Sequence, residues 1–344
     1  MAKPAGRNLL DRRVEDPFPE RVVLRDGCYK SCHICIIAPM RDDGYFPRGT
    51  STLRRVMEHR AVGAHYGQRA LCIGALAPLN YVGTARHTRQ LNMPFKRLVR
   101  TAKGFEAIIF GSRAEADRVL SMVRKMHERV NGELPEAAGP YPAGTPYDAL
   151  DPELMLWTVA LMMDSAEVFH DLLVRRLRSH EREALWQDYI RFAELFGMPR
   201  DAAPPTYPEF RRFYDSRLAG DDLWLTPEAR HVGYCTAFEI PFPPRLAPFK
   251  PAHDLVLLGS LPSRVRAEYE LPFTAPQRLA FRATVRAMRA GRIAVPGFLG
   301  MGRCTWLFDG VAATEARRLA KGKPTPGISP TGELLGRTPR RQAA

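Results

Sequence analysis

The sequence predicts one mainly helical domain. Apolar residues recur at spacings of three and four along most of the chain, alternating strand-like patterns are scarce, and several segments begin with helix-capping residues. With 344 residues, 45% of them hydrophobic, the chain can bury a substantial core. We expect an irregular N-terminal extension over residues 1–47, a helical domain over residues 48–322 and a flexible basic tail over residues 323–344.

Start and stop signals mark the helices in the first half of this domain. Ser112 and Glu115 form the clearest capping box, which predicts a helix over residues 113–130. Before it we expect a helical region that is interrupted at Pro78. Another helix should hold Pro94 in its first turn, because proline lacks the N–H that a helix interior needs.

The second half carries similar signals. Asp151 and Pro152 form an N-cap and a first-turn proline, and Thr206 and Glu209 form a second capping box. The stretch over residues 133–150 is rich in proline and glycine, and we expect a long loop there. The helices expected after this loop cover residues 152–175, 179–197, 207–218, 226–236, 255–260, 276–290 and 311–321.

Charge and hydropathy limit the possible partners and location. The net charge of +14 comes from arginine, since only eight residues are lysine. Such a chain can attract anionic lipid or the acid groups of a ligand, but its basic and aromatic residues do not interleave as in nucleic-acid-binding modules, so we expect no nucleic-acid partner. No apolar run is long enough for a signal peptide or a spanning helix. We therefore expect a cytoplasmic protein, with peripheral membrane contact left open.

His127 is the first candidate functional residue. It follows Val123 by four positions and Leu120 by seven, so it shares the apolar face of its predicted helix. On such a face a histidine is more often a core residue bonded to a carbonyl than a ligand. A basic cluster precedes it, however, and haem requires both a neutral imidazole in an apolar slot and cations for its acid groups. The cluster consists of Lys96, Arg97, Arg100, Thr101 and Lys103, for which a solvated face is the alternative.

Cysteines give two further candidate sites. The first consists of Cys28, Cys32 and Cys35, with His33 among them. This spacing is the one used by radical enzymes that bind a four-iron cluster and S-adenosylmethionine. The same four side chains could instead hold a zinc ion. The helical context that follows differs from the barrel of those enzymes, so incidental thiols are the alternative. Cys304 ends a glycine-rich segment similar to the cysteine loop of thiolate-ligated haem monooxygenases, but it comes one residue early.

An ordered series of motifs carries a family resemblance. Between about residues 71 and 286 the chain resembles the catalytic domain shared by bacterial rubber oxygenases (latex-clearing proteins) and the fungal MpaB-type oxygenase. The motifs are His87-Thr88, Arg97-Leu98-Val99-Arg100-Thr101, Phe110-Gly111, Val123-Arg124 with His127, Asp151-Pro152 before Leu156-Trp157, Asp164-Ser165, Pro205-Thr206-Tyr207 and Leu261-Pro262.

The resemblance implies a globin-like helical core that binds haem b and uses O2 to oxidise an apolar, isoprenoid-like or lipid-like substrate. His127 matches the family's proximal iron ligand. Arg97 and Thr101 match the arginine and threonine that support the haem. Arg100 stands where rubber oxygenases have a lysine that approaches the iron, and we expect it or His87 near the open face.

The chain also departs from the family pattern. Ala77 and Val159 stand where the family commonly has histidines, in His-Pro and Trp-x-His motifs. Arg100 replaces a lysine, and a guanidinium stays protonated and is a poor ligand. These departures leave two alternatives open. One is a non-catalytic helical protein that binds a lipid or a partner, and the other is a metal-binding protein that uses Cys28, Cys32 and Cys35.

Overall fold

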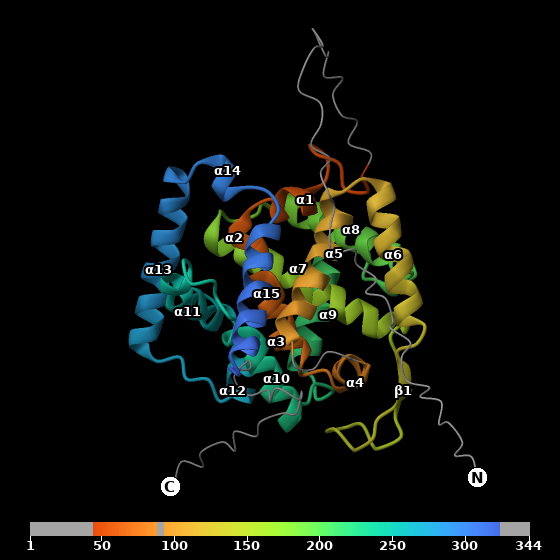
Figure 1. The fold of residues 1–344 in the computed structure, drawn as a ribbon. Coiled ribbons are helices and arrows are strands. Elements are labelled where there is room, and N and C mark those ends of the chain that lie inside the picture. The colour runs from red at the N-terminus through yellow and green to blue at the C-terminus, as the bar shows by residue number, and fades with distance from the viewer. Residues whose placement is uncertain (1–43, 88–92, 324–344) are drawn as a thin grey trace, which may run out of the picture. The chain divides into compact units, whose positions relative to one another are not determined.

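Helices make up most of the structure, a computed structural model that describes residues 44–87 and 93–323 (Figure 1). This confirms the mainly helical class predicted from the sequence. The cluster at Cys28, Cys32 and Cys35 lies outside the described residues, as do the chain up to residue 43 and from residue 324 onward. No helix within the described ranges is both long enough and apolar enough to span a bilayer.

Three short helices occupy the region predicted as one helical stretch after Ser51. They are α1 (Thr52–Met57), α2 (Arg60–Gly63) and α3 (Tyr66–Gly74), and α4 (Pro78–Arg86) follows them. The backbone leaves helical geometry at His59 and His65, the residues just before α2 and α3. Both imidazole rings pack against rings from later in the chain. Tertiary packing therefore overrides the local helical pattern here.

The helices α5 (Pro94–Phe110) and α6 (Arg113–His127) form an antiparallel hairpin (Figure 1). Pro94 occupies the first turn of α5, as predicted. The predicted capping box is also confirmed: the Glu115 N–H donates to Ser112 Oγ over 3.3 Å, and the Ser112 N–H donates to Glu115 Oε2 over 2.9 Å. The helix ends at His127 rather than at residue 130.

A two-stranded sheet lies inside the segment that we expected to be only a loop. Strands β1 (Asn131–Glu133) and β2 (Pro146–Asp148) pair antiparallel, with Gly132 opposite Tyr147. Gly132 has a φ of +153°, and a Cβ there would lie 2.9 Å from the Tyr147 hydroxyl. The prediction was wrong for these residues because such short strands show no alternation of polar and apolar side chains.

The helix α7 (Pro152–Leu173) forms the centre of the core, with buried residues on all its faces. Its predicted N-cap is confirmed, since Asp151 accepts from the N–H groups of Glu153 and Leu154. The elements after it are α8 (Ser179–Leu195), η1 (Arg200–Ala202), α9 (Tyr207–Ala219), α10 (Pro227–Phe238), η2 (Ala247–Phe249), α11 (Lys250–Ser260), α12 (Ser263–Glu268), α13 (Ala275–Ala294), α14 (Gly297–Gly300) and α15 (Thr305–Ala320).

Two of these later helices begin earlier than predicted. α11 starts at Lys250 and α15 at Thr305, because the apolar periodicity in their first turns is weak. The predicted capping box at the start of α9 is confirmed, with the Glu209 N–H donating to Thr206 Oγ1.

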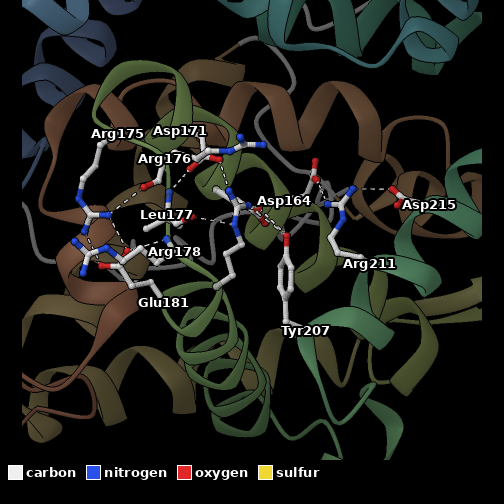
Figure 2. Close-up of polar contacts among 12 residues, drawn as sticks. Asp164, Asp171, Arg175, Arg176, Leu177, Arg178, Glu181, Tyr207, Arg211 and Asp215 are labelled. Atoms are coloured by element: carbon white, nitrogen blue, oxygen red, sulfur yellow. Dashed lines mark hydrogen bonds and ion pairs between the residues drawn. The ribbon is translucent and has the colours of Figure 1, made fainter.

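A buried polar network ties α7 to its neighbours. The Asp164 carboxylate accepts from Arg69 of α3 over 2.6 Å. It also accepts from Arg211 of α9, which pairs with Asp215 as well (Figure 2). Asp164 and Arg69 are both buried. One turn further along α7, Glu167 accepts from the Tyr207 hydroxyl over 2.7 Å. The network fixes α7, the helix that supports the rest of the domain.

Candidate functional site

The α5–α6 hairpin places the predicted site residues at one end of a pair of packed helices. The helices approach closely where Gly104 faces Val119, since a Cβ on the glycine would lie 3.4 Å from Val119 Cγ1. Counting along two antiparallel helices from this contact brings Arg97 and Arg100 to the level of the last turn of α6. That turn holds His127.

His127 is half-buried and is the last residue of α6. Burial lowers the pKa of its imidazole, so the ring is neutral near pH 7. Within the described ranges its ring has no hydrogen-bond partner. A neutral imidazole with an available lone pair is the form that binds a metal. The apolar stripe beside it is less enclosed than predicted, because Val123 is only half-buried and Met126 is exposed.

The α5 residues of the basic cluster differ in their surroundings. Arg97 is half-buried, and burial lowers the pKa of its guanidinium while the neighbouring Tyr81 opposes that change. Arg100 is also half-buried. Thr101 is exposed, and its hydroxyl donates to the Arg97 carbonyl over 3.4 Å. Lys103 pairs with Asp309 of α15. Arg97 and Arg100 are therefore the half-buried arginines of the cluster, and both lie on the half of α5 that precedes Gly104.

His87 lies at the exposed end of α4, and its Nε2 is 3.2 Å from the Tyr147 hydroxyl of β2. Gly83 of α4 packs against both Tyr147 and Val130, since a Cβ on the glycine would lie 3.2 Å from Val130 Cγ1. Val130 follows directly after the end of α6, and its N–H donates to the His127 carbonyl. The structure therefore brings His87 to the same end of the hairpin as His127.

The two positions that lack the family histidines are in the apolar core. Ala77 precedes α4 and Val159 lies on α7, and both side chains are buried. Neither can relay a proton. Over the part of the chain that the structure describes, no three His, Cys, Asp or Glu side chains gather as they would to hold a metal ion on their own.

Four other histidines form two ring pairs that the sequence did not reveal. His59 packs edge-on against His170, with ring centroids 5.5 Å apart, and His65 stacks on His253 at 4.6 Å. Burial lowers the pKa of His59 and His170 to about 4 and that of His65 to about 3. His59, His65 and His170 are therefore neutral near pH 7. No sequence signal could have found them, because they come from four separate segments.

Cys304 has a structural role. Its side chain is buried, and burial raises its thiol pKa to about 12. The thiol donates to the Arg60 carbonyl, and the Cys304 N–H donates to Glu106. A thiol held in this way is not the thiolate that ligates iron in the monooxygenases.

A cavity of about 780 Å³ lies between α10, α11 and the start of α13. Its walls include Phe238, Phe242, Leu255 and Leu258, and Lys250 is among its charged residues. None of the predicted site residues lines this cavity.

Comparisons with known proteins give one family match. The family model described as "ER-bound oxygenase mpaB/B'/Rubber oxygenase, catalytic domain" matches residues 54–290. The uncharacterized proteins Rv2237 of Mycobacterium tuberculosis and Mb2261 of Mycobacterium bovis are each 24% identical over 204 residues, which cover 59% of this chain and 76% of each relative. No solved structure matches the chain.

Proposed function

Since this chain belongs to the family of MpaB-type and rubber oxygenase catalytic domains, we propose that it is a haem b-dependent oxygenase whose iron is bound by His127. The family assignment supports an oxidoreductase of the oxygenase type. The haem, its ligand and the substrate class are our proposal.

The single observation that carries the proposal is the state of His127. A structural histidine usually satisfies at least one ring nitrogen, as His65 does when its Nδ1 lies 2.7 Å from the Ala61 carbonyl oxygen. His127 is half-buried, neutral near pH 7 and has no partner among the described residues. Arg97 and Arg100 lie on the adjacent helix at its level. One imidazole and two cations match the needs of an iron ion and two propionates.

In this proposal His127 would hold the haem, and Arg97 and Arg100 would pair with its acid groups. When bound, the haem supplies an iron that activates O2. Arg97 is well suited to the pairing because it is already partly desolvated, and charges attract more strongly where water is excluded. Arg100 stays protonated, so we assign it the role of a cation and hydrogen-bond donor rather than of an iron ligand.

The remaining residues shape the surroundings. His87 and Tyr147 form a hydrogen-bonded pair at the exposed end of α4, where a proton could be exchanged with solvent. Ala77 and Val159 make the interior apolar where relatives have histidines. Apolar interior positions exclude water and favour a hydrocarbon substrate, so we propose an isoprenoid-like or lipid-like molecule as the co-substrate of O2.

The test is the visible spectrum of the full chain purified from cells supplied with a haem precursor. We expect a Soret band that is lost in His127→Ala and kept in His180→Ala, a matched change at an exposed histidine of α8. Circular dichroism checks that both variants fold. A colourless wild-type protein that also fails to bind added haem would overturn the proposal.

The large cavity favours a second candidate, a haem-free protein that binds a lipid-like molecule. Its volume of about 780 Å³ lies in the range of small-molecule sites, and several of its wall residues are apolar. A colourless protein that binds a fluorescent fatty acid, with binding lost in Leu258→Arg, would support it. A broad absorbance that depends on Cys32 would instead support the alternative of a metal at the cysteine cluster.

A further inference from the structure

A segment of unusual composition covers α13, α14 and the turn after them. Residues 275–303 contain six arginines and no aspartate or glutamate. Arg289 donates to the Leu172 carbonyl and so fastens α13 to α7, whereas Arg278 donates to the Phe273 carbonyl just before its own helix. Arg282, Arg286 and Arg292 are exposed, and none of them forms an ion pair with a described residue. The segment therefore presents uncompensated positive charge to solvent.

Large apolar side chains are exposed beside this charge. Residues 291–299 are all exposed, including Ile293 at 85% and Phe298 at 76%. A monomeric protein rarely exposes so many large apolar side chains together unless they contact something. We call this group the apolar tip, and it consists of Ile293, Val295, Phe298, Leu299 and Trp306.

The backbone of the apolar tip is held in place. Arg60 donates to the carbonyls of Phe298 over 2.6 Å, of Leu299 over 2.9 Å and of Arg303 over 3.0 Å. The Gly302 N–H donates to the Glu58 carbonyl over 2.7 Å. These bonds fix the chain while Phe298 and Leu299 stay exposed, so the exposure is a property of the folded domain rather than of a frayed end.

Part of the apolar side of α13 is already used. Val285 and Met288 pack against the core, and Phe281 packs against Gly259 of α11. Figure 1 shows α13 and α14 at one side of the described domain, outside α11. What remains for an external partner is the arginine side of α13 together with the apolar tip.

We propose that this face docks on the surface of an anionic lipid bilayer, with the apolar tip among the headgroups and Arg282, Arg286 and Arg292 on lipid phosphates. Apolar side chains beside several cations are the usual composition of a peripheral membrane-binding surface. A second copy of this chain is a poorer occupant, because two surfaces with six arginines and no acid would repel each other. The proposal does not depend on the haem.

Sedimentation of the full chain with vesicles tests the proposal. We expect binding to an equal mixture of phosphatidylglycerol and phosphatidylcholine and much weaker binding to phosphatidylcholine alone. The double variant Phe298→Ser/Leu299→Ser should bind the mixed vesicles at least about tenfold more weakly, because its apolar insertion is lost. Arg286→Gln/Arg292→Gln should lose about fivefold for each arginine removed.

The matched control is Phe249→Ser, which removes an exposed apolar side chain outside both α13 and the apolar tip and should leave binding unchanged. Equal binding of the tip variant and the wild type would overturn the proposal, as would equal binding to neutral and anionic vesicles. Light scattering tests whether a second copy of the chain covers this face instead. If the wild type is a dimer that binds no vesicles, and the tip variant is a monomer, the face is a contact between copies and the proposal is overturned.

Discussion

The imidazole rings of His65 and His253 stack with their centroids 4.6 Å apart and their planes inclined by 27°. Both side chains are buried, and His65 Nε2 has no hydrogen-bond partner among the described residues. Protonation of His65 would therefore place a positive charge against another imidazole in a site that water does not reach. The pair, together with His170 of α7 and His59 just before α2, makes the core sensitive to acid.

We predict that the free energy of unfolding falls as the pH drops below about 6.5. The folded-state pKa of His65, about 3, is below its unfolded value of 6.5, so in this range the unfolded chain binds protons that the folded chain does not. At pH 5.5 the loss from His65 alone is about 1.4 kcal/mol. Urea unfolding at pH 7.5 and pH 5.5 measures it, with His180→Gln as the control for an exposed histidine. A His65→Gln variant with an undiminished pH slope would contradict this source of the effect.

The buried ion pair gives a second prediction. Asp164→Ala leaves Arg69 buried without its counter-charge, which should destabilise the protein by about 3–5 kcal/mol. Asp215→Ala removes an exposed partner of Arg211 and should cost less than about 1 kcal/mol. Thermal and urea unfolding compare the two variants. The double variant Arg69→Met/Asp164→Leu should recover most of the loss, and its failure to do so would show that the network has a role beyond charge neutralisation.

Local signals predicted much of this fold, and distant packing decided the rest. Ser112 with Glu115 and Thr206 with Glu209 fixed two helix starts, because a capping box involves only neighbouring residues. The pairing of α5 with α6 was predictable for the same reason, since a short turn joins the two helices.

What the sequence could not reveal involved partners far apart in the chain. The breaks at His59 and His65 depend on rings from α7 and α11. The strand pair depends on the contact of Gly132 with Tyr147, and the stack of His65 on His253 has no local signature. His127 is half-buried, whereas the sequence predicted that it would be enclosed. The reason is that α6 packs against the domain along little of its surface, and its one buried residue is Ala116.

The capping box of α6 offers a third prediction. Ser112→Ala removes the acceptor of the Glu115 N–H and should cost about 1 kcal/mol, whereas Ser112→Gly should cost only a few tenths. Because α6 is held mainly by α5, fraying at its start should also loosen the position of His127. Unfolding measurements give the first effect, and a lower affinity for added haem would give the second. Unchanged stability would mean that Glu115 supports the helix without Ser112.

Arg97 provides a fourth prediction, which rests on the proposed haem site. A hydrogen bond to a charged group contributes about 1.5–3 kcal/mol, so Arg97→Gln should weaken haem binding by roughly 10–100-fold. Arg129→Gln, at an exposed arginine just beyond α6, is the matched control and should bind haem as the wild type does. Titration followed at the Soret band measures both. If the Soret band persists but Arg97→Gln has no effect, the acid groups pair with other cations.

The last prediction concerns the missing histidines. Val159 lies on the central helix with its side chain buried in the main apolar core, so Val159→His must force a larger, polar ring into a packed and dry site. Overpacking costs about 1–3 kcal/mol and an unpaired buried polar group about as much again, so we expect a loss of more than about 2 kcal/mol in urea unfolding. Ala77→His should behave similarly, because that site is also buried. Thr158→His, at the exposed neighbouring position, should be tolerated.

If only the two variants at buried positions lose stability, the core has adapted to the absence of both histidines. Any reaction of this protein then proceeds without them. If either variant were as stable as the wild type and altered the spectrum of bound haem, room for the family's polar groups would remain, and the distal side would still be open to chemistry of the family's kind.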